Sequence, residues 1–435
     1  MRLPACLHMS FFFFCRAFFL APFVSQADLT EGGYSYTVDG DMASITGFDS
    51  DYSGALSIAD TLGGHSVTCI GDEAFLYCTG LTDVIIPATV TRIGDGSFFN
   101  CTGLTSVILP TNVISIGRSA FSGCIGLTSV TIPCNVTSLG DSVFSGCSSL
   151  TSATLLNNLS MFQAGLVFGI DCENLTDVVI GEGETTIGPH AFDFCTGLTR
   201  IIIPATVTSI GDGAFYNCTG LTNFTISSNV TNIGDHAFGA SGIITISIPN
   251  SIKRIGNAVF GHCDKLTSIT IPDSVTSIGD YAFNGCALTD VTIPASVTKI
   301  GNNSFQYCQS MTTVRFKGNA PSLGGRVFDY VPATVFYLPG TTGWGTAFGG
   351  CPTSLWTLPY PLILNRDQSS GMQTNGFGFT ISWATNMPVV IETSTNLTSG
   401  VWVPLQTNTL SNGVSYFRDP SWTNYPSRFY RIVWP

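Results

Sequence analysis

The chain has 435 residues, of which 44% are hydrophobic and only 10% are charged, a composition that favours short strands and tight turns over a helical bundle. Its length predicts either several domains or one elongated repeat array. The formal net charge is -12 and the 16 Lys and Arg are spread thinly, so no basic stripe could neutralise a phosphate backbone, and we expect no nucleic-acid partner.

Residues 1–27 read MRLPACLHMSFFFFCRAFFLAPFVSQA. A charged start at Arg2, a Phe-rich stretch and the small residues Ser25 and Ala27 predict a signal peptide that is cleaved after Ala27. Arg16 interrupts the apolar stretch, which fits better if translation starts at Met9, and a retained signal anchor is the alternative. Because no later run of about 20 apolar residues follows, we expect no membrane span after signal removal and a secreted or cell-surface location.

Residues 28–62 come ahead of the repeats. The run YSYTVDGDMASITGF alternates apolar and polar residues around a Gly-Asp turn, which predicts a β-hairpin that caps the array. Asp49, Asp51 and Ser53, with Asp60 at the twelfth position, resemble a calcium-binding loop of the EF-hand or dockerin kind. The flanking segments suggest strand and turn where such loops adjoin helices, so a polar surface turn is the favoured interpretation. We expect no cofactor.

Residues 63–338 carry a repeat in which the phrase I-G-D-x-A-F returns every 22 to 24 residues. Such a period predicts a solenoid, whose coils bury their apolar sides only by stacking. The twelve phenylalanines that mark the coils are Phe75, Phe98, Phe121, Phe144, Phe168, Phe192, Phe215, Phe238, Phe260, Phe283, Phe305 and Phe328.

Each coil contains a segment like LTSVTIP, in which Leu127, Val130 and Ile132 would point inward while Ser129 and Thr131 point outward. The A-F pair is expected in the core, and the Asp before it is expected to cap a brief helical turn. The aspartates at this position are Asp72, Asp95, Asp141, Asp212, Asp235 and Asp280.

The recurring L-x-x-V-x-I-P-x-x-V-x-x-I-G-x-x-A-F, over about residues 60 to 340, resembles the BspA-type leucine-rich repeats of bacterial and protist surface proteins. The resemblance implies a right-handed leucine-rich-repeat coil with a parallel β-sheet on one face, short helical turns, and a binding role at the cell surface. Met161 to Phe168 lacks the I-G-D step, Ser241 replaces the cysteine and Pro189 replaces the aspartate, which predicts irregular coils that could bend the array.

The C-terminal part departs from the repeat. Residues 339–360 bring Trp344, Phe348 and Trp356, which suit a cap, and the Pro-rich then polar residues 361–371 predict a linker. Five alternating runs in residues 372–435 predict a small antiparallel β-sandwich. Its sequence motifs resemble those of a C-terminal β domain appended to many secreted bacterial proteins. The role considered for such a domain is surface retention or secretion.

Ten of the fifteen cysteines share one repeat position, which predicts a ladder of buried free thiols in preference to disulfides, since stacked side chains point the same way. No C-x-x-C pair indicates zinc in the mature chain. The histidines His65, His190, His236 and His262 lie on separate coils, so we expect solvated side chains there and no shared metal.

The outward strand positions form a Ser/Thr surface with scattered charge, and we identify no catalytic residue on them. The candidate binding face consists of Asp83, Asp177, Arg200, Asn223, Asp290 and Arg315. The leading hypothesis is a non-catalytic adhesion protein, expected as a monomer, that binds an extracellular protein or a matrix or glycan ligand. The alternatives are a structural envelope or spacer protein that displays its C-terminal domain and, third, an extracellular polysaccharide-active enzyme.

Overall fold

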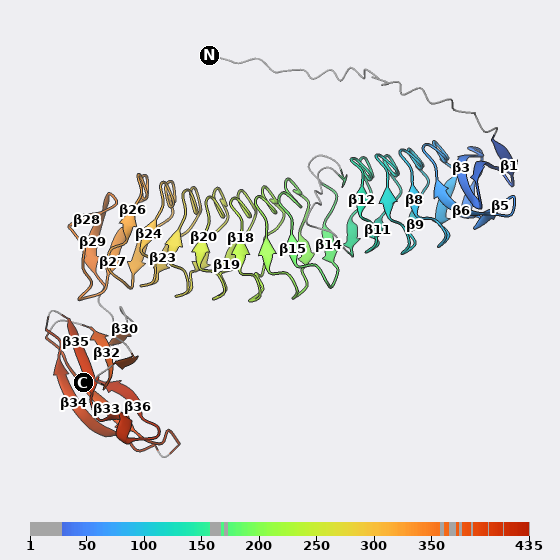
Figure 1. Ribbon diagram of the computed structural model, residues 1–435. Coiled ribbons are helices and arrows are strands. Elements are labelled where there is room, and N and C mark those ends of the chain that lie inside the picture. The colour runs from blue at the N-terminus through green and yellow to red at the C-terminus, as the bar shows by residue number, and fades with distance from the viewer. Residues whose placement is uncertain are drawn as a thin grey trace, which may run out of the picture.

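The computed structural model describes residues 28–156, 167–168, 173–356, 361–364, 371–373, 376–383, 386–398, 400–411 and 413–434. In these ranges the chain forms a rod of stacked coils, with a separate β domain beside its C-terminal end (Figure 1). The repeat solenoid that the sequence predicts is confirmed. The expected signal peptide and most of the irregular segment Met161 to Phe168 lie outside the described residues.

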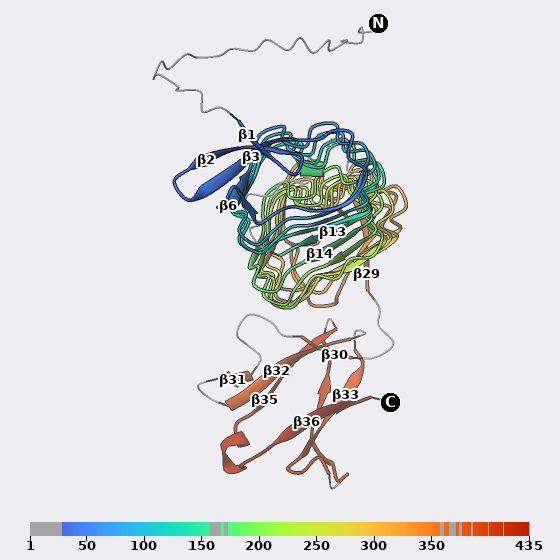
Figure 2. The ribbon, with the colours of Figure 1, turned by 90° about the vertical axis from the view of Figure 1, so that its right-hand side faces the viewer.

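The N-terminal end is covered by antiparallel strands. The strands of this end are β1 (Leu29–Glu31), β2 (Tyr34–Asp39), β3 (Met42–Phe48), β5 (Thr61–Leu62) and β6 (His65–Ile70). β2 and β3 form a hairpin that stands beside the outline of the coils in the view along the rod (Figure 2), and β3 continues parallel to β6. The rings of Tyr34 and Phe48 lie 6.5 Å and 5.0 Å from that of Phe75, so the hairpin closes the core of the first coil.

The LTSVTI segments form parallel strands, here called the first strand row. Its members are β4 (Gly54–Ser57), β7 (Leu81–Ile85), β9 (Ser106–Ile108), β11 (Ser129–Ile132), β13 (Ser152–Leu155), β14 (Asp177–Ile180), β16 (Arg200–Ile202), β19 (Thr245–Ser247), β21 (Ser268–Thr270), β23 (Asp290–Ile293), β25 (Thr313–Phe316), β27 (Thr334–Tyr337) and β29 (Cys351–Leu355). Neighbouring strands pair in register, as Ser129 with Ser152. Side chains alternate as predicted, with Ser and Thr outward and Val and Ile buried.

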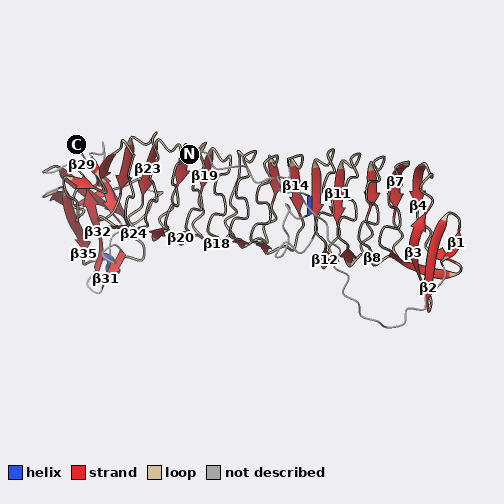
Figure 3. Cartoon of the chain, turned by 90° about the horizontal axis from the view of Figure 1, so that it is seen from above, coloured by secondary structure: helices blue, strands red, loops and turns tan. Residues whose placement is uncertain are grey.

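A second strand row, which the sequence analysis did not predict, runs along the other side of the rod (Figure 3). It starts at β6 and continues through β8 (Arg92–Ile93), β10 (Ser115–Ile116), β12 (Ser138–Leu139), β15 (Thr186–Ile187), β17 (Ser209–Ile210), β18 (Asn232–Ile233), β20 (Arg254–Ile255), β22 (Ser277–Ile278), β24 (Lys299–Ile300) and β26 (Ser322–Leu323). Each strand of this row after β6 has only two residues, which is too few to show an alternation of apolar and polar residues in the sequence. The expected parallel sheet on one face is present, and this second row of short strands lies in addition to it.

The prediction of short helical turns was wrong for the coils as described, where only Val167 and Phe168 are helical. In the I-G-D-x-A-F segments the glycine N–H donates to the preceding coil, while the phenylalanine N–H donates to the next coil, as Phe98 does to the carbonyl of Ala120 at 2.7 Å. Wherever they are described, the residues two positions before and after each phenylalanine take left-handed conformations, such as His190 with φ 55° and Phe194 with φ 56°. This backbone aims its hydrogen bonds between coils, which a helix cannot do.

The repeat aspartates bond between coils and do not cap helices. Asp235 accepts the backbone N–H of Asn257 through Oδ1 at 2.7 Å and its side-chain amide through Oδ2 at 2.8 Å. The same backbone contact joins Asp72 to Asp95, Asp95 to Arg118, Asp212 to Asp235, Asn257 to Asp280, Asp280 to Asn302 and Asn302 to Gly325. A side-chain oxygen thus accepts a backbone N–H group that does not bond within the strand pairing.

Stacked phenylalanines run through the core. From Phe75 to Phe168, and again from Phe192 to Phe328, consecutive rings lie nearly parallel with centroids 4.8 to 5.7 Å apart. This spacing is close to that of stacked parallel strands, and each fully buried ring stabilises the array by roughly 1.5 to 3 kcal/mol, with Phe168 only partly buried.

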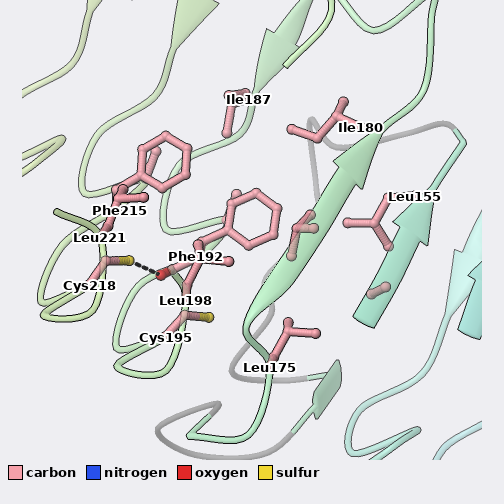
Figure 4. Close-up of a cluster of buried hydrophobic side chains, with 14 of the residues drawn as sticks. Leu155, Leu175, Ile180, Ile187, Phe192, Cys195, Leu198, Phe215, Cys218 and Leu221 are labelled. Atoms are coloured by element: carbon pink, nitrogen blue, oxygen red, sulfur yellow. Dashed lines mark hydrogen bonds between the residues drawn. The ribbon is translucent and has the colours of Figure 1, made fainter. Parts of the chain in front are cut away.

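Buried thiols accompany the rings (Figure 4). Cys218 Sγ donates to the carbonyl of Phe192, one coil earlier, at 3.0 Å. Six more thiols make the same bond at 3.0 to 3.2 Å, those of Cys101, Cys124, Cys147, Cys263, Cys286 and Cys308. No disulfide joins the cysteines in the described residues, so the predicted thiol ladder is present, with Cys172 outside the described ranges.

The C-terminal end of the rod is closed by aromatic side chains. Trp344 stacks on Tyr337 at 5.1 Å and contacts Phe316 at 5.0 Å, and its Nε1 donates to Thr341 Oγ1 at 2.7 Å. Phe348, in the short strand β28 (Ala347–Phe348), lies against Phe316 and Trp344. Trp356 follows β29 and is only partly buried.

The C-terminal domain consists of two antiparallel sheets around one apolar core. The first sheet contains β30 (Leu362–Leu364), β31 (Gly371–Gln373), β32 (Gly376–Ser382) and β35 (Val414–Asp419), and the second contains β33 (Pro388–Ser394), β34 (Val403–Thr409) and β36 (Phe429–Val433). A short 3-10 helix η1 (Trp422–Asn424) follows β35. Phe379 and Phe417 from the first sheet share the core with Val389 and Ile391 from the second.

The linker expected at 361–371 contributes structure to this domain. β30 pairs with β32 through Leu362–Leu364, so the domain takes in residues before the expected boundary at 372. The Pro-rich and polar composition concealed this short apolar strand. Ser382 is fully buried, and its hydroxyl donates to the carbonyl of Pro339 in the last coil at 2.8 Å, which joins the domain to the rod.

We expect the Asp235→Ala substitution to lower the free energy of unfolding by about 1 to 2 kcal/mol, because the Asn257 N–H loses its acceptor. Chemical denaturation of the mature chain measures this. Asp235→Asn is the matched control: it keeps the Oδ1 acceptor for the Asn257 N–H but loses the Oδ2 acceptor for the Asn257 side-chain amide, so it should lose clearly less stability than Asp235→Ala. Equal losses in both variants would contradict the role of the Oδ1 contact.

Burial raises the pKa of Cys308 from its ordinary value near 9 to about 12. The folded state therefore favours the protonated thiol, so its stabilising contribution is complete below about pH 9 and is lost as pH rises toward 12. We expect the stability difference between wild type and Cys308→Ala to shrink by up to about 1.4 kcal/mol per pH unit above pH 9, measured by denaturation at several pH values. A difference that stays constant from pH 8 to pH 11 would contradict this assignment.

Candidate functional site

The outer face of the first strand row presents the candidate residues on successive coils. Asp177 and Arg200 are partners in the register of β14 and β16, and Arg200 Nη1 lies 3.6 Å from Asp177 Oδ1. Asn223 follows on the next coil, in an isolated bridge with Thr245. The structure thus brings Asp177, Arg200 and Asn223 together as one surface, here called the central patch.

The central patch is open to solvent. The side chains of Arg200 and Asp177 are 64% and 41% exposed, and an exposed ion pair of this kind contributes only about 0 to 1 kcal/mol to stability. Thr176 Oγ1 donates to Asp177 Oδ2 at 2.9 Å, which orients the carboxylate. The two charges are therefore fixed in position but remain exposed to solvent, so a binding partner can contact them.

A second pair lies near the C-terminal end. Arg315 Nη1 is 3.2 Å from Asp290 Oδ1, on the neighbouring strand. The Arg315 guanidinium also lies over the ring of Trp356, 5.9 Å from its centroid. Asp83 stands apart near the N-terminal end, where β7 pairs with β9, so the six candidates form three groups and not one site.

The calcium-loop residues do not wrap around a common centre. Asp49 Oδ1 accepts the backbone N–H of Asp51 at 3.0 Å, as in a polar turn. After Ser53 the chain enters strand β4, which pairs with β7 and carries Asp60 away from the turn. Throughout the described ranges, no three His, Cys, Asp or Glu side chains are grouped so that they could hold a metal ion.

Three histidines lie on the turn side of separate coils. His190 Nδ1 lies 3.2 Å from Asp193 Oδ2, and burial raises the pKa of Asp193 while His190 opposes this shift. His236 and His262 occupy other coils, both with positive φ. They are placed as surface groups and do not converge.

Sequence reasoning missed an aromatic surface on the turns. The residue two positions after each core phenylalanine, here called the turn row, has positive φ wherever the structure describes it. The turn row is Tyr77, Asn100, Gly123, Gly146, Phe194, Asn217, Ala240, His262, Gly285, Tyr307 and Tyr330. Its four aromatic side chains are between 42% and 67% exposed. Reading this repeat position down the sequence would have revealed them.

No helix within the described ranges is long and apolar enough to cross a membrane. The family model described as BspA type leucine rich repeat region (6 copies) matches residues 68–169, 167–244 and 231–352. No curated protein matches the chain.

Among solved structures, a leucine-rich repeat protein from Bacteroides ovatus is 24% identical, with 76% of this chain and 100% of that one covered and a TM-score of 0.50. A leucine rich cell surface protein from Faecalibacterium prausnitzii is 26% identical, with 68% of this chain and 96% of that one covered and a TM-score of 0.34. The first of these shows the same fold.

Proposed function

Because this chain belongs to the family of BspA-type leucine-rich repeat proteins, we propose that it is a secreted or cell-surface protein that binds extracellular macromolecules without catalysis. Repeat solenoids present long surfaces built from equivalent positions, and they bind partners over area more than through a single pocket. The signal-like residues 1–27 support export of the chain.

The observation that carries the proposal is the central patch. Asp177, Arg200 and Asn223 lie on three consecutive coils and offer a carboxylate, a guanidinium and an amide. Val179 and Ile202 lie beside the ion pair on β14 and β16, and the outward residues of the coils beyond, on β19 and β21, are Ser and Thr. Such a surface supplies hydrogen bonds and paired charges over several coils, which suits a polar protein or matrix partner.

The absence of catalysis is part of the proposal and follows from the spacing of the acids. Paired carboxylates for glycoside cleavage must stand within about 10 Å of one another around a cleft. Asp83, Asp177 and Asp290 instead lie on β7, β14 and β23, separated by several intervening strands.

We expect the double variant Asp177→Ala/Arg200→Ala to weaken binding of the mature chain to its partner by about tenfold or more, as for a charged interface centre. The partner is sought by solid-phase binding of labelled residues 28–435 to immobilised extracellular matrix proteins and matrix extracts. Arg254→Ala, an exposed arginine on β20 in the second strand row, is the matched control and should bind as wild type. Undiminished binding by the double variant would contradict the proposal that the central patch is the interface.

A spacer role has one observation in its favour. The bond from Ser382 to Pro339 fixes the C-terminal domain on the last coil, so the rod could hold that domain at a set distance. Cell fractionation separates the two functions, because a spacer is expected to be abundant in the envelope and to bind no soluble partner.

A further inference from the structure

Two tyrosines form an exposed stack at the C-terminal end of the turn row. The rings of Tyr307 and Tyr330 are 4.9 Å apart and inclined by 7°. They are 46% and 67% exposed, and we call this pair the tyrosine platform. Tyr307 covers one face of Tyr330, so the other face of Tyr330 is the one that a ligand can reach.

The outer face of Tyr330 is left open by the next coil. The next turn along the rod, Gly349-Gly350 between β28 and β29, lies beside Tyr330 and lines the same surface. Gly350 has φ +91°, and a Cβ there would meet nothing within 4 Å. The missing side chain leaves a depression of about 760 Å³ between Tyr330 and the two glycines.

The rim of this depression is polar and short of positive charge. Gln309 and Asp329 line it beside Tyr330, and Val331 and Pro332 complete its wall. An aromatic face carries negative potential and attracts the polarised C–H groups of a sugar ring, while an amide and a carboxylate accept or donate bonds to hydroxyls. With Asp329 in the site and a net charge of -12 on the chain, an anionic glycan is repelled.

The backbone conformation of the two tyrosines is also unfavourable for the stability of the fold. Tyr307 and Tyr330 have φ 63° and 62°, a conformation that bulky residues rarely take. Asn100, Gly123 and Gly146 accept positive φ more readily at this position, whereas Tyr77 and Phe194 share the unfavourable conformation. Tyr307 and Tyr330 differ from those two in forming a parallel stack beside a depression, and this arrangement points to a ligand.

We propose that the tyrosine platform binds a neutral polysaccharide, with a sugar ring stacked on Tyr330 and its hydroxyls bonded to Gln309 and Asp329. The site lies on the turns, apart from the central patch. The inference rests on the proposed non-catalytic binding function and names a ligand class for a second surface. Stacking on one ring with two polar groups resembles small-ligand sites, where a few polar groups fix the orientation.

The test is affinity electrophoresis of residues 28–435 in native gels that contain mixed-linkage β-glucan, xyloglucan, galactomannan or dextran, with hyaluronan as the anionic probe. At least one neutral polysaccharide should retard the wild type, and hyaluronan should not. Tyr330→Ala should weaken that binding by at least about tenfold, and Tyr330→Phe should keep it because the ring remains. Tyr77→Ala is the matched control, since Tyr77 holds the same turn-row position with φ 59° in the first coil.

Three outcomes would overturn the inference: no retardation by any neutral polysaccharide, equal retardation of Tyr330→Ala and wild type, or binding of hyaluronan through Tyr330. Circular dichroism melting of each variant checks that the fold is intact. Asp177→Ala/Arg200→Ala should be retarded like wild type in these gels. The tests of the tyrosine platform and of the central patch are therefore independent, because a loss of matrix-protein binding leaves polysaccharide binding unchanged.

Discussion

The structure depends on backbone hydrogen bonds that run from coil to coil. Gly117 donates to the carbonyl of Ile93, and Phe98 donates to that of Ala120, so the chain bonds to the coils on both sides. A coil on its own leaves the N–H groups that pair with other coils without acceptors, and the coils must therefore stack in register. Register in turn places equal residues above one another, which is why phenylalanine rings, thiols and aspartates form continuous ladders.

The repeat in the sequence predicts the rod because its period is unambiguous, and the alternation in LTSVTI predicts the first strand row for the same reason. The second strand row escaped prediction because two residues such as Ser209 and Ile210 show no period. The repeat aspartates resemble helix caps in the sequence, because the side-chain oxygen accepts a backbone N–H in a cap as well. In this chain that N–H comes from the next coil, 23 residues away for Asp212 and Asp235, and local sequence cannot distinguish the two.

The candidate site was only partly predictable. Strand alternation correctly placed Asp177 and Arg200 outward, and equal spacing along the repeat implied that they would be neighbours. Strand alternation gives no sign of the tyrosine platform, because its residues lie in turns, and only the equal spacing of Tyr307 and Tyr330 along the repeat indicates it. Two surfaces of different chemistry result, a polar patch on a strand row and aromatic rings on the turns.

The thiol ladder also bears on how the chain acquires its structure. Cys218 is sealed only when its sulfur contacts the carbonyl of Phe192 and the next coil covers it. Until then each thiol is open to any oxidant around it. Growth of the rod from one end would cover the thiols one after another. The rate at which coils dock would therefore set how long each cysteine stays open to oxidation.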